Sequence, residues 1–228
     1  MNDTVAALKE IVLAYSQIEG IYVHPFPNSP SLQDKIVFDE IENEHFKNAL
    51  SLREEKHVPF WDALMLSFFD KDQFSLRILG NVINSHASRK KICIKTNAEF
   101  DSNLQSYILS EGNYAINSEV KTSEPGRRHL LLLDFQIPES PKNNLVVEHI
   151  LRVLEVGPGY LFRSGRSYHF MGSTLITIGK LTKYLGKCLL FSPIIDKSWI
   201  AHQLIDRSCS LRFTQKNGMF PELIKKIK

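Results

Sequence analysis

The spacing of apolar residues divides the chain into a mainly helical first part and a later part in which strands and helices alternate. Apolar residues recur at helical spacing before residue 70, and short apolar or alternating runs follow from Leu76 onward. In the first part, the predicted helices lie at 4–17, 37–52 and 59–69, with a proline-rich connection after the first. The pattern predicts two regions, a mainly helical accessory region at 1–75 and an α+β core at 76–228.

Within the core, the elements alternate in an order that is typical of a two-layer α+β fold. The predicted strands are 76–82, 91–95, 129–135, 160–163, 167–171 and 210–214, and the predicted helices are 100–111, 144–156 and 175–190. The residues Ser164-Gly165-Arg166 predict a tight hairpin turn. The order of strand, helix, hairpin, helix and strand resembles a split βαβ, ferredoxin-like sheet. The basic end of the chain, 225–228, reads as a solvated tail.

Composition narrows the class of protein without naming a function. With 43% hydrophobic and 23% charged residues, a globular fold is expected. No apolar run is long enough to span a bilayer and the first residues do not resemble a secretory signal, so we expect a cytoplasmic protein that makes no membrane contact. The three cysteines are far apart in apolar surroundings and read as buried small hydrophobes. A formal net charge of +3 permits a nucleic-acid partner but does not require one.

Two acids follow apolar runs, where a carboxylate can leave the core and face a cleft. Asp134 ends the run Leu130-Leu131-Leu132-Leu133, and Asp206 follows Leu204-Ile205. Two carboxylates from separate strands can converge on a divalent cation, and Mg²⁺ is commonly held by such carboxylates together with substrate phosphates. Acids at strand ends also cap helices or pair with arginine, so the pattern alone does not decide between these roles.

Between these acids, the segment 163–169 offers a group of hydrogen-bond donors. Because strand side chains alternate, Ser167 and His169 share one face and Tyr168 lies on the other. A serine, a histidine and the nearby Arg166 suit a triphosphate, and Gly165 lets a backbone approach closely. The same residues also fit a satisfied core histidine beside an ordinary hairpin turn. A Ser-His-Asp hydrolase is disfavoured because the chain has no Gly-x-Ser-x-Gly elbow here.

Taken together, these elements resemble the archaeo-eukaryotic primase-polymerase superfamily, including its bacterial primase 1D-like branch. The superfamily carries an acidic motif I, a Ser-x-His motif II and a hydrophobic-Asp motif III on an RRM-like sheet. Here Leu133-Asp134-Phe135-Gln136 resembles motif I, Ser167-Tyr168-His169 motif II and Ile205-Asp206 motif III. The resemblance covers about residues 126–220, and its weight comes from the order of the three motifs.

The resemblance implies a nucleotidyltransferase of the primase or polymerase type, acting in DNA replication or repair. It implies catalytic roles for Asp134, His169 and Asp206, with Mg²⁺ or Mn²⁺ held by the two aspartates. Nucleotide phosphates would contact Ser167 and His169, and Arg166 and Arg212 fit the same role. The implied partners are a nucleoside triphosphate, a DNA or RNA template, and a helicase or another replication or defence protein.

One position departs from the superfamily pattern. Gln136 stands where motif I has its second acid, which removes a ligand and a negative charge from a two-metal site. Glu139 is placed in a proline-bounded turn, where it is poorly positioned to compensate. Three hypotheses therefore remain: an active primase or polymerase, a catalytically weakened or inactive module that binds nucleotide or nucleic acid, and a helical interaction protein with an incidental β domain.

Overall fold

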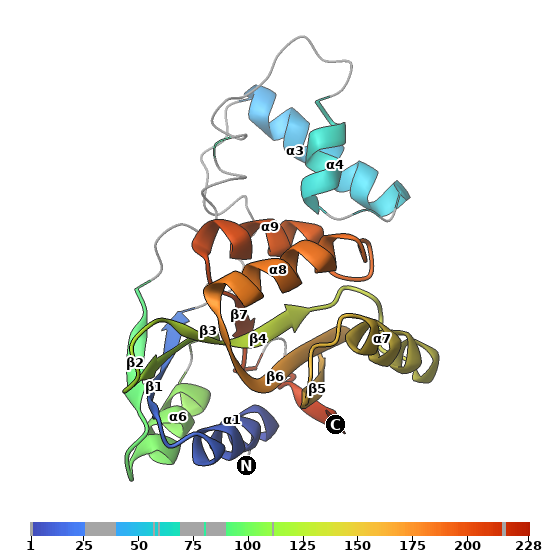
Figure 1. Cartoon of the computed structure of the whole chain (residues 1–228). Helices are drawn as coiled ribbons and strands as arrows, with labels where there is room; N and C mark the ends of the chain where they lie inside the picture. The colour runs from blue at the N-terminus through green and yellow to red at the C-terminus, as the bar shows by residue number, and fades with distance from the viewer. Residues whose placement is uncertain are drawn as a thin grey trace. The chain divides into compact units, whose positions relative to one another are not determined.

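The computed structural model describes residues 2–25, 40–56, 58, 60–68, 80, 90–110, 112–215 and 218–228 (Figure 1). The chain divides into two compact units, residues 1–28 with 89–228 and residues 29–88. This division differs from the boundary predicted at 75/76. The reason is that the first helix and the first strand belong to the larger unit, in which that strand pairs with two others.

The larger unit contains most of the described helices and strands. Its elements are α1 (Asp3–Ala14), β1 (Ile18–Pro25), β2 (Ile92–Lys95), α6 (Phe100–Leu109), β3 (Tyr114–Thr122), β4 (Arg128–Asp134), α7 (Pro141–Val153), β5 (Gly159–Ser164), β6 (Ser167–Thr177), α8 (Ile178–Leu189), α9 (Lys197–Asp206), β7 (Ser210–Arg212) and β8 (Glu222–Ile227). The smaller unit contains α3 (Glu40–Lys56) and α4 (Phe60–Leu66), which enclose a small apolar cluster. Among the described residues, no helix has the length and apolar character needed to cross a membrane.

The described strands of the larger unit form one eight-stranded sheet in which all pairs are antiparallel. The strand order is β2-β1-β3-β4-β6-β5-β8, and β7 pairs with β3 beside this path. One edge of β3 is shared, because its first half pairs with β7 and its second half pairs with β4. A fork therefore separates β4 from β7. The predicted α+β class with a primase-like core sheet is confirmed.

Helices cover both faces of this sheet. Helices α8 and α9 lie on one face, and α1 and α6 lie on the other (Figure 1). Polar contacts hold the outer layers to the strands: the Tyr160 hydroxyl of β5 donates to Glu10 of α1 at 2.8 Å. The apolar core between the layers is fully enclosed, and its largest members include Phe135, Phe162, Tyr168, Phe170 and Phe213. The site described below thus rests on a sheet that is packed on both sides.

Local sequence explains where the main helices begin. The Asn2 side chain accepts hydrogen bonds from the backbone of Thr4 and Val5, so Asn2 rather than a later residue caps α1. Ser140 caps α7 with Pro141 at the first helical position, which is a favoured place for proline. Thr177 caps α8 directly after β6. The predicted helices at 4–17, 100–111, 144–156 and 175–190 are confirmed with shifted ends.

Four elements differ from the sequence prediction. The region before the prolines contains β1, the polar stretch near residue 118 lies in β3, the basic end forms β8, and the segment 197–206 is the helix α9. Two of these strands carry polar or charged residues because β8 lies at a sheet edge and β3 lines the fork, where alternation of apolar residues is not required. The strand predicted at 76–82 falls almost wholly outside the described residues.

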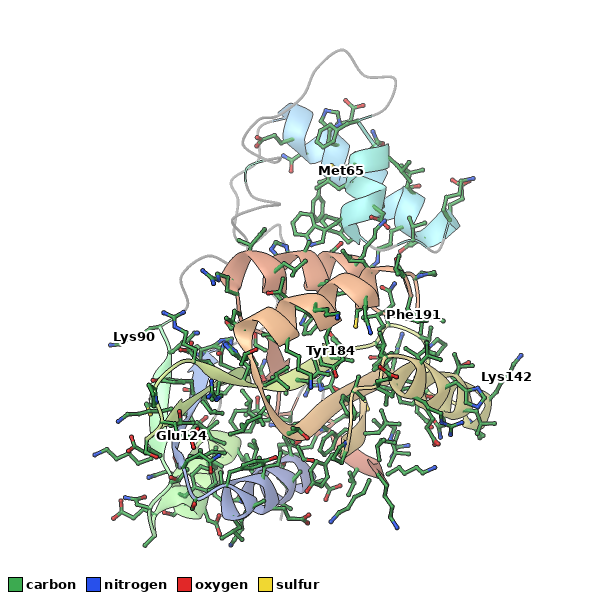
Figure 2. The ribbon with its side chains drawn as sticks, in the orientation of Figure 1. Met65, Lys90, Glu124, Lys142, Tyr184 and Phe191 are labelled. Atoms are coloured by element: carbon green, nitrogen blue, oxygen red, sulfur yellow. The ribbon has the colours of Figure 1, made fainter. Side chains whose placement is uncertain are left out.

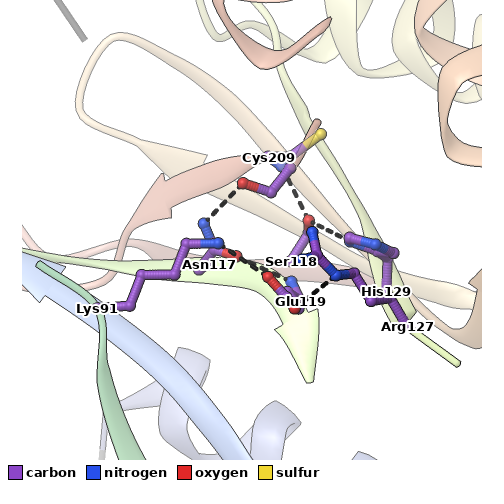
Figure 3. A network of polar contacts seen from close by, with 8 residues as sticks. Lys91, Asn117, Ser118, Glu119, Arg127, His129 and Cys209 are labelled. Carbon is purple, nitrogen blue, oxygen red and sulfur yellow. Dashed lines mark hydrogen bonds and ion pairs between the residues drawn. The ribbon is translucent and has the colours of Figure 1, made fainter. Parts of the chain in front are cut away.

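A buried polar cluster fixes β7 against β3 (Figure 3). Ser118 and Cys209 exchange hydrogen bonds, from Ser118 N to Cys209 O at 2.7 Å and from Cys209 N to the Ser118 hydroxyl at 2.8 Å. That hydroxyl lies 3.2 Å from Nδ1 of His129, whose buried Nε2 has no hydrogen-bond partner among the described residues. At the rim, Glu119 pairs with Lys91 at 2.9 Å. The cluster sets the start of β7, and thereby the position of the residue that ends it.

We predict that His129 makes the fold sensitive to acid. Burial lowers the pKa of His129 from 6.5 to about 4, since a protonated ring would need an acceptor at Nε2. The unfolded chain takes up this proton below pH 6.5 and the folded chain only near pH 4, so stability is lost as the pH falls through that window. Urea unfolding between pH 7 and pH 4 should show a loss of about 3 kcal/mol from this residue.

The matched comparison uses two histidines of the larger unit. His129→Gln should remove that part of the pH dependence, whereas His149→Gln, at an exposed position on α7, should leave it unchanged. Equal pH profiles for wild type and His129→Gln would contradict the prediction.

Candidate functional site

Asp134 and His169 lie side by side on the face of the sheet that carries α1. They are paired in the register of β4 and β6, and Phe162 of β5 lies opposite His169. His169 Nε2 is 3.5 Å from the Asp134 carboxylate, and the aspartate side chain keeps 31% of its surface exposed. As the alternation of the strand predicts, Tyr168 points to the other face, where its hydroxyl donates to the backbone of Ser140. Motifs I and II therefore meet at one place.

The predicted hairpin carries the adjacent polar groups. Ser164 and Ser167 face each other across the turn, and Gly165 has φ of 67°, a left-handed conformation that suits glycine. Ser167 is half-buried on the same face as His169, and Arg166 is exposed at the turn. A groove of about 450 Å³ runs along the outer side of the hairpin. It is lined by Pro138, Glu139, Arg163, Gly165, Arg166, Met219, Phe220 and Glu222.

Arg212 ends β7 and places a buried cation at the fork between β4 and β7. Its guanidinium donates to the Ser164 hydroxyl at 3.0 Å, to Met219 O at 3.4 Å and to Thr214 O. Burial lowers the pKa of Arg212, while the negative charge of Asp134 acts in the opposite direction and favours the charged form. The guanidinium donors are thus directed at protein acceptors, and the negative charge of Asp134 favours the charged form of Arg212.

Gln136 lies two residues beyond Asp134 and is tied to the turn that follows α8. Its backbone N–H donates to Ile194 O at 3.0 Å, and its side-chain amide nitrogen donates to Pro193 O. A carboxylate at this position could not donate that second bond. The glutamine therefore has a structural partner that the acid of motif I would lack.

Asp206 does not end a strand, which corrects the structural prediction made for motif III. It is the last residue of α9, an exposed position followed by Arg207 with a left-handed φ of 54°. Asp196 caps this helix by accepting hydrogen bonds from Ser198 and Trp199. Because Asp196 caps its start, the segment forms a helix, and Asp206 lies at the end of that helix. The strand that enters the fork is β7, and its last residue is Arg212.

The comparison with protein-family models decides the family. The model described as AEP-like, archaeo-eukaryotic primase 1D-like, matches residues 93–225, more than half of the chain. The chain belongs to the archaeo-eukaryotic primase 1D-like family. Within this primase-like chain, the match extends from β2 to β8 and so includes Asp134, the hairpin and Arg212. Searches of the curated proteins and of the solved structures found no significant match.

Members of primase-like families generally use divalent metal ions, which need several side-chain ligands close together. Among the described residues, no three side chains of His, Cys, Asp or Glu come together to hold a metal ion, and this includes Asp134, His169 and Asp206. The negative charge of Asp134 favours the charged form of the buried Arg212, so positive charge is already present at the fork. The residues at the fork do not fit a two-metal site.

The sequence pattern missed the internal role of Arg212. Its motif suggested a contact with nucleotide, whereas its acceptors come from Ser164, 48 residues earlier, and from the segment that follows β7. Spacing along the chain carries no signal for such a contact, which exists only because β7 enters the sheet beside β3. The buried Ser118 and His129 pair was missed for the same reason.

We predict that removal of the buried cation destabilises the fold. Arg212→Met should leave the Asp134 charge without its internal partner and the Ser164 hydroxyl without its donor, at a cost of about 3 kcal/mol in urea unfolding. Arg207→Met, at an exposed position, should cost less than about 0.5 kcal/mol. A double variant, Arg212→Met with Asp134→Asn, should recover part of the loss. Equal stabilities for the two single variants would refute the counter-charge role.

Proposed function

We propose that this chain is a primase-like module that binds nucleotide and nucleic acid and does not depend on divalent metal to do so. The observation that carries the proposal is the buried guanidinium of Arg212, which donates to Ser164 and whose charged form the negative charge of Asp134 favours. An arginine keeps its charge at all physiological pH values, so this cation is permanent. Nucleotidyl transfer is correspondingly weak or absent, in agreement with Gln136 in place of the second acid.

A neutralised carboxylate changes how a phosphate meets the site. Isolated Asp134 would repel a triphosphate, and a divalent cation would ordinarily bridge the two. With Arg212 supplying the positive charge, the repulsion is reduced without a metal. The Ser167 hydroxyl, the His169 ring and the exposed Arg166 then act as donors to phosphate oxygens, with the guanidinium of Arg166 able to bind two oxygens at once. These roles extend the resemblance of Ser167-Tyr168-His169 to motif II.

Thermal unfolding with a nucleoside triphosphate tests the binding role. With EDTA present and ligand at about ten times its dissociation constant, the nucleotide should stabilise the chain by about 1.4 kcal/mol. His169→Ala should remove this stabilisation, and Arg166→Gln should weaken it because each loses a phosphate contact. Arg207→Gln, which changes an exposed arginine at the end of α9, is the matched control and should leave the shift intact. Stabilisation that appears only when Mg²⁺ or Mn²⁺ is added would contradict metal independence.

Incubation with labelled nucleotide, a primed template and Mn²⁺ separates this proposal from an active primase or polymerase. We expect no product above that of an Asp134→Ala variant. Extension that is clearly detected and that Asp134→Ala abolishes would overturn the proposal in favour of the enzyme.

A further inference from the structure

Helix α8 has one face that packs on the sheet and an opposite face made mostly of lysine, glycine and threonine, with the exposed Leu189 and Leu190 at its C-terminal end. The inward residues Leu181, Tyr184, Leu185 and Cys188 are buried. Tyr184, labelled in Figure 2, donates its hydroxyl to Glu155 O at 2.8 Å and so fixes the rotation of the helix. The outward positions are Gly179, Lys180, Thr182, Lys183, Gly186 and Lys187, of which only Lys187 is half-buried and the others are exposed.

The three lysines form a stripe of positive charge that the protein does not neutralise. No acidic residue occurs between Ile178 and Leu189. Among the described residues, no carboxylate lies within 4.0 Å of the ammonium groups of Lys180, Lys183 or Lys187, whereas five other lysines of the larger unit, Lys9, Lys91, Lys121, Lys225 and Lys226, have such partners. The ammonium group of Lys180 lies 5.8 Å from the centroid of the Tyr184 ring. Lys180 and Lys187 are about 10 Å apart along the helix axis.

This arrangement works against the stability of the helix. Lys180 and Lys183 are three residues apart and Lys183 and Lys187 four apart, spacings at which like charges repel each other. Lys180 also lies in the first turn, where the helix dipole favours an acid. If these side chains served to stabilise the helix, acids would be expected in its first turn and opposite charges at the three- and four-residue spacings.

The glycines of the stripe are not explained by packing within the chain. A Cβ added at Gly179 or Gly186 meets nothing within 4 Å, so neither position needs a glycine to avoid a clash. Gly186 lies in the helix interior, where glycine is less favourable than alanine. What these residues do provide is access: between the lysines, the helix backbone is open to an approaching molecule.

We propose that the outward face of α8, defined by Gly179, Lys180, Lys183, Gly186 and Lys187, binds the phosphate backbone of nucleic acid. Lysines supply point charges to phosphates, and glycine permits close approach of the strand. The five positions themselves carry no aromatic or aliphatic side chain, and the exposed apolar residues of this helix, Leu189 and Leu190, lie beyond them at the C-terminal end. The inference rests on the proposed function, because it assigns nucleic acid as the ligand. It concerns a separate surface, since α8 covers the face of the sheet opposite to the face with α1, where Asp134 and His169 lie.

The test measures binding of the full chain to labelled oligothymidylate and to a duplex of equal length. Fluorescence anisotropy gives the affinity at each of several salt concentrations. Lys180→Gln/Lys183→Gln/Lys187→Gln should weaken binding at low salt at least tenfold. It should also reduce the slope of log affinity against log salt by about 2, because three phosphate contacts are lost. The control, Lys95→Gln/Lys121→Gln/Lys142→Gln, has the same change in net charge on other elements and should retain most of both quantities. The single-strand and duplex arms show which form the face prefers.

Gly186→Ala provides a second variant whose fold is not at risk. It should melt at the same temperature as wild type or higher, yet bind nucleic acid several-fold more weakly because the added methyl blocks close approach. Equal losses in the two triple variants, or no detectable binding by wild type, would overturn the inference. Binding to polyglutamate at least as tight as to oligothymidylate would overturn the assignment to nucleic acid. Nucleoside triphosphate should stabilise the α8 variants as much as the wild type. If it does not stabilise even the wild type, that result counts against the proposed function and not against the α8 surface.

Discussion

The buried guanidinium of Arg212 at the fork of the sheet has its donors bound by protein acceptors, and the negative charge of Asp134 favours its charged form. The arrangement of the site depends on how the strands bring these groups together. β7 must enter beside β3 to bring Arg212 close to the end of β4, and the hairpin between β5 and β6 must turn so that Ser164 accepts from the same guanidinium. The Ser118 and Cys209 hydrogen bonds hold the start of β7 in place. The position of Arg212 therefore depends both on the register of β7 beside β3 and on the hydrogen bonds that hold that strand.

The same interaction changes the chemistry that the fold can support. Members of primase-like families generally use divalent metal ions. In this chain the positive charge of Arg212 belongs to the protein itself, and a chelator cannot remove it. Two nearby features fit this difference: Gln136 has a donor role toward Pro193, and Asp206 lies at a helix end instead of in the fork.

The parts of the fold that could be predicted from the sequence are those with a strong local period. The buried strand 128–134, the hairpin at Gly165 and helices α7 and α8 have apolar patterns or turn residues that leave little choice. Strands β3 and β8 were missed because their polar residues are satisfied by distant partners, as in the pairs Glu119 with Lys91 and Lys225 with Glu148. Short-range patterns do not contain such partners.

Some residues of the candidate site could likewise be predicted from the sequence, and others could not. Asp134, Ser167 and His169 were recognised because motif order and strand alternation place them together, whereas the partner of Asp134 is set by where β7 joins the sheet. Asp206 was misplaced because an acid after two apolar residues fits both a strand end and a helix end. Asp196, ten residues earlier, is the capping residue that distinguishes the two.

The position of the smaller unit in the chain order has a consequence for modularity. Residues 29–88 are inserted between β1 and β2, and these strands are direct antiparallel neighbours, with Val23 opposite Ile92. The chain therefore leaves the sheet and returns to it at one edge, at the separation that a hairpin turn would span. Such an insertion point lets a helical unit be gained, lost or exchanged without altering strand order. The sheet with its charge-neutralised site can in this way remain constant while the inserted unit diverges.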